Sequence, residues 1–352
     1  MVVTTSALAE MVVGSGTFLE VLVAPHVDDA PGPVDVVVPI YQAPEPFARC
    51  LDSLLAHLDL TQHGLIFVVD GPQPEATERR LTLLEGNAGV TILRNPARRG
   101  FVASVNQAMA TSIRDVVLLN ADTVVTAGWL EKLRAAAYSA PEIATATPFS
   151  NTATICSLPR FLDANFLPRG ETIESFARRI DENSERVYPH VPTGVGVCLF
   201  IKRRALSELG LFDEAAFGLG YGEESEFCQR ALKTGWVHVL DDATFIYHEG
   251  HRSFGAERKR LGRGAHRRLA ALHPEYLATI ARFVHEDPLA PIRERALRGL
   301  LTKPTTRDRR GFKVVHVVHG WPPSAHGGTE LYAAWLVAEQ ARHRDVAVYT
   351  RI

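Results

Sequence analysis

DVVLLNADT, residues 115–123, is the stretch that decides the fold of this chain. Its four consecutive aliphatic residues, 116–119, are typical of a strand that is buried on both faces of a mostly parallel sheet. Such sheets bind ligands at the carboxyl ends of their strands, where Asn120 and Asp122 would lie. A carboxylate at that edge can hold a hard divalent cation, which in turn holds a diphosphate. The same two residues also suit the cap of a helix expected near Trp129, so the remaining sequence has to decide between the two interpretations.

The segment from residue 34 onward alternates strands with helices. Apolar runs predict strands at 34–39, 65–69, 90–93 and 115–119. Helical periodicity predicts helices at 44–57, 74–84 and 101–110. This alternation indicates an α/β fold with a mostly parallel central sheet and right-handed connections. After residue 148 the pattern loosens into a polar loop at 150–168, strands at 195–202 and 237–240, and a helix at 223–233.

The bulk composition is that of an ordinary globular protein. The chain has 352 residues, of which 46% are hydrophobic and 22% charged, and its net charge of −2 gives no reason to expect nucleic acid as a partner. The four cysteines are far apart, which excludes the usual zinc spacings and fits a reducing compartment. No apolar run reaches the roughly 18 residues of a transmembrane helix, and the N-terminus has no basic secretory segment. We therefore expect a cytoplasmic protein, and peripheral contact with the inner face of the plasma membrane stays open.

Four segments follow from these patterns. Residues 1–33 are an N-terminal segment and linker, with one strand expected at 17–23. Residues 34–301 form the main domain, and its part from residue 256 is helical and rich in arginine, as in a solvated face or a phosphate-binding face. Residues 302–311 are a polar linker. Residues 312–352 predict a strand at 313–318, a helix at 330–342 and a strand at 346–349, a unit too small to be stable alone, which suggests a fragment of a longer protein.

Two motifs on the N-terminal side are candidates for binding a nucleotide. Asp70 ends the second predicted strand, where its carboxylate can accept a hydrogen bond from the N3–H of a pyrimidine or can simply form an Asp-Gly turn. Arg98, Arg99 and Gly100 open the predicted helix that carries Asn106. A helix N-terminus with a glycine and two arginines favours phosphate, and the alternative is an exposed basic turn.

Acids and a histidine on the C-terminal side are candidates for chemistry. Glu223 and Glu224 begin a predicted helix. Clustered carboxylates raise one another's pKa and can leave one of them suited to proton abstraction, whereas a single acid at a helix start is explained by the helix dipole alone. His248 ends a short apolar run and with Asp122 could complete a metal site, although a lone histidine is more often structural.

The order and spacing of these residues resemble the family 2 glycosyltransferases, which have the GT-A fold. The resemblance covers roughly residues 34–255 and rests on seven features in the family's order. They are Val38-Pro39-Ile40-Tyr41, Asp70, Arg99-Gly100-Phe101 with Asn106, Asn120-Ala121-Asp122, Gly194, the Gly222-Glu223-Glu224 helix with Arg230, and His248. Within the family, GYGEESEFCQR at 220–230 resembles bacterial rhamnosyltransferase-like members of cell-surface polysaccharide synthesis.

This resemblance implies an inverting, metal-dependent enzyme that moves a sugar, with rhamnose as one candidate, from a dTDP- or UDP-sugar to a glycan or lipid-linked glycan. The nucleotide-sugar-binding residues that it implies are Pro39, Tyr41, Asp70, Arg99, Gly100, Asn106, Asn120, Ala121 and Asp122. Asp122, His248 and Asn120 would hold Mn²⁺ or Mg²⁺. Glu224 would be the general base, with Glu223 as the other acid of the catalytic pair, and Gly194 would border the acceptor.

Two residues depart from the family's pattern. Asn120 stands where the family has an aspartate, which removes one charge from the metal site. The acid pair is Glu-Glu rather than Glu-Asp, which leaves the choice between Glu223 and Glu224 open. A non-catalytic nucleotide- or glycan-binding module with a degenerate metal site is therefore the alternative. A nucleotidyltransferase would need a Gly-rich loop with a lysine after the first strand, and YQAP at 41–44 is not such a loop.

The C-terminal 40 residues carry a second resemblance. Residues 313–351, with Pro322-Pro323 and Gly327-Gly328-Thr329-Glu330, resemble the first βαβ unit of a GT-B glycosyltransferase of family 4. This implies that the parent protein carries two transferases in tandem. The sequence leaves open the sugar, the acceptor and the choice between thymine and uracil.

Overall fold

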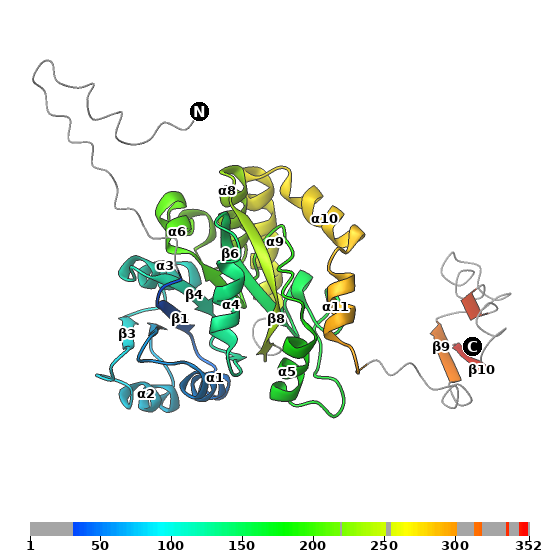
Figure 1. Ribbon diagram of the computed structural model, residues 1–352, viewed down its shortest axis with the longest axis horizontal. Coiled ribbons are helices and arrows are strands. Elements are labelled where there is room, and N and C mark those ends of the chain that lie inside the picture. Colours follow the sequence, from blue (N-terminus) through cyan, green and yellow to red (C-terminus); the bar gives the residue numbers. More distant parts are fainter. Residues whose placement is uncertain are drawn as a thin grey trace, which may run out of the picture. The chain divides into compact units, whose positions relative to one another are not determined.

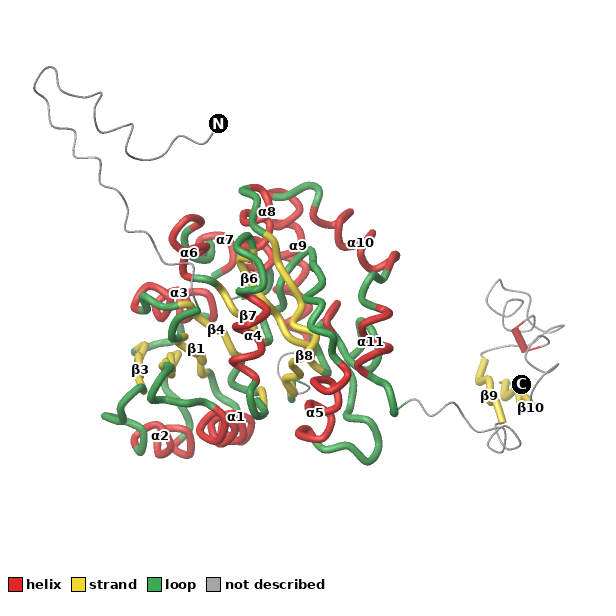
Figure 2. The backbone as a smooth tube through the Cα atoms, viewed as in Figure 1, coloured by secondary structure: helices red, strands yellow, loops and turns green. Residues whose placement is uncertain are grey.

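The computed structural model describes residues 31–218, 220–250, 255–300, 313–318, 336–337 and 345–350. The chain divides into two compact units, residues 1–296 and 297–352, and each is described by itself. The strand expected at 17–23 and most of the helix expected at 330–342 lie outside the described residues. Figure 1 labels the elements of the chain, and Figure 2 shows the strands of the first unit lying among its helices.

The first unit is built on an eight-stranded mixed sheet with the strand order β3-β2-β1-β4-β7-β6-β8-β5. The strands are β1 Val34–Ile40, β2 Gly64–Asp70, β3 Val90–Asn95, β4 Asp115–Leu119, β5 Thr123–Val124, β6 Ile143–Ser150, β7 Cys198–Ile201 and β8 Val237–His248. Strands β1 to β4 are parallel to one another, as the alternating pattern predicts, whereas β7 runs antiparallel to β4 and β6. All five residues of β4 are buried, which fits its position inside the sheet. The α/β fold is therefore confirmed.

Helices pack on both faces of this sheet. They are α1 Pro44–His57, α2 Glu75–Thr82, α3 Phe101–Thr111, α4 Trp129–Ala137, α5 Ile173–Asn183, α6 Arg203–Leu209, α7 Glu214–Phe217, α8 Glu223–Lys233, α9 Gly255–Leu272, α10 Tyr276–Glu286 and α11 Ala290–Ala296. The helices expected at 44–57, 101–110 and 223–233 are present within a residue or two, and the C-terminal helical region consists of α9 to α11. The sequence did not predict α5, α6 or β6. None of the described helices is long and apolar enough to cross a membrane.

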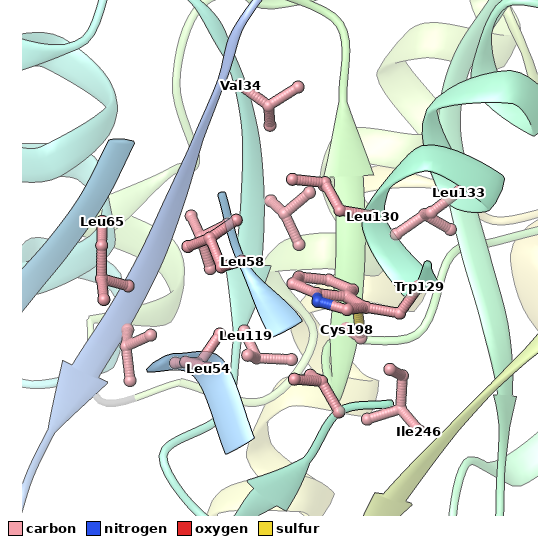
Figure 3. Packing of buried hydrophobic residues seen from close by; sticks show 14 of the residues in the cluster. Val34, Leu54, Leu58, Leu65, Leu119, Trp129, Leu130, Leu133, Cys198 and Ile246 are labelled. Carbon is pink, nitrogen blue, oxygen red and sulfur yellow. The ribbon is translucent and has the colours of Figure 1, made fainter. Parts of the chain in front are cut away.

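Trp129 anchors the segment that follows the opening stretch of the sequence. Its side chain is fully buried, and it belongs to the same apolar cluster as Leu119 at the end of β4 and Ile246 of β8 (Figure 3). Burying a large apolar side chain contributes about 1.5–3 kcal/mol. The turn at 120–128 is therefore fixed at both ends, by β4 before it and by α4 after it. A second cluster on the opposite face, which includes Val105 of α3 and Phe227 of α8, holds the helices that carry other candidate residues.

The second unit contains one parallel pair of strands among its described residues. β9 Lys313–Val318 pairs in register with β10 Asp345–Thr350. This confirms the two strands expected at 313–318 and 346–349 and their parallel direction, which a βαβ unit requires.

Candidate active site

The carboxyl ends of three parallel strands bring several predicted donor-binding residues to one edge of the sheet. Ile40 of β1 pairs with Val69 of β2, and Val37 of β1 pairs with Leu118 of β4, so the three strands end close together. The partly exposed Pro39 lies in β1, and Tyr41 follows it directly. The turn Asn120-Ala121-Asp122 follows β4, and each of its residues is partly exposed. This edge has the position at which open α/β sheets bind ligands.

Asp122 and His248 form the candidate cation site. They come together because Thr123 of β5 pairs with His248 of β8. The distance between Asp122 Oδ1 and His248 Nε2 is 3.2 Å. His248 Nδ1 lies 3.2 Å from the carbonyl oxygen of Thr152, which can only accept, so Nδ1 carries the proton and Nε2 is the nitrogen that faces the carboxylate. This is the arrangement that metal-binding histidines adopt, and the donor set of carboxylate and imidazole therefore fits a divalent cation.

Asn120 completes the turn, and its main-chain N–H and carbonyl both form hydrogen bonds within the protein. Its N–H donates to the carbonyl of Val197, and its own carbonyl accepts from the Thr123 hydroxyl at 2.7 Å. Within the described ranges, no group of three or more His, Cys, Asp or Glu residues could hold a metal ion. Asp122 and His248 therefore provide two ligands, and any further ligands would come from the Asn120 amide or from a bound diphosphate.

Glu223, which is buried, and Glu224, which is partly exposed, form an acid pair at the start of α8. The helix begins after Gly222, whose φ of 105° lies in the left-handed region. Each glutamate has one buried carboxylate oxygen, Oε2, without a hydrogen-bond partner among the described residues. Burial raises the pKa of both carboxyls, and the nearby charge of Glu224 raises the pKa of Glu223 further. The pair therefore holds a proton more strongly than exposed glutamates do, which is the property expected of a general base or acid.

The loop at 192–197 connects the acid pair to the cation site. Gln229 of α8 donates to the carbonyl of Pro192 at 3.0 Å, and the N–H of Gly194 donates to the sulfur of Cys228 at 3.2 Å. At its other end, the carbonyl of Val197 accepts from Asn120 at 3.1 Å. One short loop is thus hydrogen-bonded both to the helix of the acids and to the turn of Asp122.

Gly194 has a packing role in the structure. This glycine is buried, and a Cβ atom placed on it would lie 2.3 Å from Leu199 Cδ1, so packing requires a glycine here. Its position beside the acceptor stays a prediction. The glycine that faces the acids is Gly196, whose added Cβ would lie 3.5 Å from the carboxyl carbon of Glu224. In the sequence VPTGVGV, both glycines fit a loop equally well, so the sequence did not separate them.

Asp70 holds the turn before α3. Its carboxylate is buried, with Oδ1 accepting from the N–H of Arg99 at 2.7 Å and Oδ2 accepting from the N–H of Gly100 at 2.9 Å. Oδ1 also accepts from Asn95 Nδ2 at 3.1 Å. The carboxylate therefore fixes the turn that leads into α3, and its contact with the base stays a prediction. The sequence could not indicate this, because the partners follow 25 to 30 residues later.

The start of α3 provides one exposed cation and one structural amide. Arg99 is half-exposed, and Gly100 has the left-handed φ of 96° that the entry into α3 requires. Asn106 was expected to contact the donor, but both ends of its amide bind the main chain of Phe212, at 2.9 and 3.1 Å. Asn106 is therefore a structural residue that fastens α3 to the segment before α7.

Near the predicted nucleotide pocket, the sequence missed Gln73, and Arg98 has a contact besides the phosphate contact predicted for it. The guanidinium of Arg98 lies 4.3 Å from the centroid of the Tyr41 ring, a cation–π contact. Gln42 and Ala43, which follow Tyr41, have left-handed φ values of 61° and 53°. Gln73 holds this turn, because its Oε1 accepts from the N–H of Gln42 at 2.7 Å. Nothing in the sequence pattern pointed to Gln73, whose partner lies 31 residues away.

The fold is that of the GT-A glycosyltransferases. The profile of glycosyl transferase family 2 matches residues 35–210, half of the chain, and the chain belongs to this family. The family assignment made from the sequence is thereby confirmed.

GalNAc-T7 shows the same fold, and further solved structures are similar at low sequence identity. GalNAc-T7 with UDP, GalNAc and Mn²⁺ superimposes with a TM-score of 0.52 at 15% identity, over 75% of this chain and 53% of that one. The mannosyltransferase PcManGT from Pyrobaculum calidifontis, in complex with GDP-Man and Mn²⁺, has a TM-score of 0.48 at 19% identity, over 90% of this chain and 82% of that one. Residues 1–349 of S. aureus TarS give 0.45 at 12% identity, over 68% and 72%. This chain spans about half of the length of GalNAc-T7, and no curated protein matches it.

Proposed function

We propose that the chain transfers a sugar, with inversion, from a nucleotide-diphosphate sugar to a hydroxyl of a glycan or lipid-linked glycan. The observation that carries the proposal is the acid pair Glu223 and Glu224, each with one buried carboxylate oxygen, connected by the loop at 192–197 to the turn that bears Asp122. The acid pair supplies a candidate base, and the turn supplies a candidate cation site. Both lie in a member of family 2.

The residues of the candidate site would have the following roles in the reaction. Glu224 takes the proton of the acceptor hydroxyl, whose oxygen forms the bond to the anomeric carbon as the bond from that carbon to the diphosphate breaks. Asp122 and His248 would hold Mn²⁺ or Mg²⁺, with Asn120 beside them. When bound, the cation offsets negative charge on the departing diphosphate. GalNAc-T7, which shares the fold, is solved with UDP and Mn²⁺.

The choice of Glu224 over Glu223 rests on its surroundings. Glu224 lies against Gly196 in the loop that reaches Asn120, whereas Oε1 of Glu223 lies on the side of Gly220, which in turn approaches Phe101 of α3. We propose that Glu224 faces the acceptor and that Glu223 faces the donor.

The finer details of substrate and setting follow from the resemblance of residues 220–230 to rhamnosyltransferase-like enzymes. On this basis the donor is a dTDP- or UDP-sugar, with rhamnose as a candidate, and the product belongs to a cell-surface polysaccharide made at the inner face of the plasma membrane. The parallel pair β9 and β10 supports the further proposal that residues 312–352 begin a GT-B domain of family 4.

A non-catalytic binding module is the competing function, and a specific observation favours it. Asn120 replaces a charged ligand, and the described residues offer the cation only Asp122 and His248 from among His, Cys, Asp and Glu. Such a module would bind the nucleotide without turning it over.

The test is a donor screen with matched variants. Purified chain, Mn²⁺ and a panel of dTDP- and UDP-sugars are incubated with glycan acceptors, and released nucleoside diphosphate is measured. Glu224→Gln should lower kcat by about 10²–10⁴-fold. Glu75→Gln, at a solvent-exposed position of α2, is the matched control and should have full activity. Nucleotide binding without turnover by the unmodified chain would favour the binding module, and full activity of Glu224→Gln would contradict the assignment of the base.

A further inference from the structure

A buried amide, Asn151, holds the candidate metal ligand His248. Asn151 directly follows β6 and is 1% exposed. Its Oδ1 accepts from the N–H of His248 at 2.7 Å, and its Nδ2 donates to the carbonyl of His248 at 2.9 Å. One side chain therefore satisfies both main-chain groups of His248.

This contact extends the sheet by one residue beyond its regular pairing. β6 and β8 are paired up to Ser150 and Ile246, and the Asn151 side chain then replaces the main chain as the partner of β8. The next residue, Thr152, supplies the carbonyl that accepts from His248 Nδ1. The end of β6 thus fixes both the backbone of His248 and the rotation of its ring.

The other side of the imidazole is fixed by packing. A Cβ atom placed on Gly250 would lie 2.7 Å from His248 Cε1 and 2.9 Å from Nε2, so the ring lies directly against the backbone of residue 250. With Nδ1 bound to Thr152 and one face against Gly250, Nε2 is directed at Asp122 Oδ1, 3.2 Å away. A metal-binding imidazole needs this orientation before the metal arrives.

We propose that Asn151 is the positioning residue of the cation site. The proposal rests on the proposed function, because it takes Asp122 and His248 as the ligands. Asn151 does not touch the cation. It holds His248 where Nε2 and Asp122 can bind the same ion, so its loss lowers the affinity for the metal even when the fold is intact.

Asn165 provides a matched control from the same hydrogen-bond cluster. It is also 1% exposed, and its Nδ2 donates to the carbonyls of Asn151, Arg160 and Asp163 at 3.2, 2.9 and 3.0 Å. These hydrogen bonds do not involve His248. Removing its amide therefore leaves a cavity of the same size as removing that of Asn151, while the two hydrogen bonds from Asn151 to His248 remain.

The test measures binding of Mn²⁺ itself, by the electron paramagnetic resonance signal of the free ion, in the full chain with UDP present. Asn151→Ala should bind Mn²⁺ about 10- to 100-fold more weakly than the unmodified chain, the range found when a residue that orients a ligand is removed. His248→Ala sets the scale for complete loss of the imidazole. Asn165→Ala should stay within about 3-fold of the unmodified chain, because it does not contact the ligand. Circular dichroism checks that each variant is folded, and Asn151→Ser is used if the alanine variant does not fold.

The outcomes separate this inference from the proposed function. If the unmodified chain binds Mn²⁺ and transfers sugar, but Asn151→Ala binds Mn²⁺ equally well, the positioning role is wrong and the proposed function stands. Equal losses in Asn151→Ala and Asn165→Ala would show that the amides act only on the fold, and would also overturn the inference. If the unmodified chain does not bind Mn²⁺ at all, the metal-dependent function and the inference both fail.

Discussion

Replacing Asp241 with asparagine should stabilise the protein, and the gain should depend on pH. Asp241 lies in β8 and is fully buried. Its Oδ1 accepts from the N–H of Ala243 at 2.9 Å, while its Oδ2 has no hydrogen-bond partner among the described residues. Burial raises the pKa of this carboxyl from 3.8 to about 6. The folded protein therefore resists the ionisation that the unfolded chain undergoes freely.

The size and sign of the effect follow from this pKa shift. A raised pKa in an acid costs the folded state nothing below pH 3.8, where Asp241 is protonated in both states. As the pH rises from 3.8 to about 6, the unfolded state gains its charge first, and the free energy of unfolding falls. Above that range the loss is constant at about 3 kcal/mol, from roughly 1.4 kcal/mol for each unit of pKa. Asparagine has no charge to bury, so Asp241→Asn should gain about 3 kcal/mol near pH 7.5 and roughly half of that near pH 5.

Urea denaturation followed by circular dichroism at these two pH values measures the difference. Asp242→Asn is the control, because both oxygens of Asp242 are used, accepting from the hydroxyl of Ser184 at 2.7 Å and the N–H of Tyr188 at 3.1 Å. That variant should lose stability. An Asp241→Asn variant that is less stable at neutral pH, or whose gain is the same at both pH values, would refute the reasoning.

Three further predictions concern the site. Gly194→Ala should destabilise the chain by about 1–3 kcal/mol, measured by thermal unfolding, because its Cβ would meet Leu199 at 2.3 Å; an unchanged midpoint would contradict the packing role. Gln73→Ala should weaken binding of UDP or dTDP in calorimetry, because the left-handed turn at Gln42 loses its acceptor at 2.7 Å; unaltered affinity would separate this turn from the nucleotide pocket. The acidic limb of the kcat/KM profile should lie above the usual pKa of glutamate, since burial raises the pKa of Glu224 and the base must lose its proton to act; a limb at the ordinary glutamate value would argue against it.

The sequence predicted the strands that are apolar and missed those that bury polar residues. The runs that form β1, β2 and β4 were visible because most of their residues are Val, Ile, Leu and Phe. β6 was not predicted, because its Thr145 and Thr147 look exposed in sequence but are buried and bonded to His238 and Cys198. The predicted end of β8 at Leu240 came before two acids, yet the strand continues to His248. Burial of polar groups depends on partners that the sequence does not place.

In the candidate site too, the sequence identified residues by their position at a strand end and missed roles that depend on distant partners. Residues named for their position at a strand end, such as Tyr41, Asn120 and Asp122, do lie at the expected edge of the sheet. The structural role of Asp70 was missed because its side chain is held by distant main-chain N–H groups, which residue type and spacing do not show. Asn151 was missed for the same reason, since His248 lies 97 residues away along the chain.

The loop at 192–197 also determines where this chain can change length during evolution. Because Pro192, Gly194 and Val197 are each hydrogen-bonded to a different fixed partner, inserting or deleting one residue would move the acids relative to Asp122. We therefore expect insertions and deletions to be excluded from this loop, which keeps its six residues.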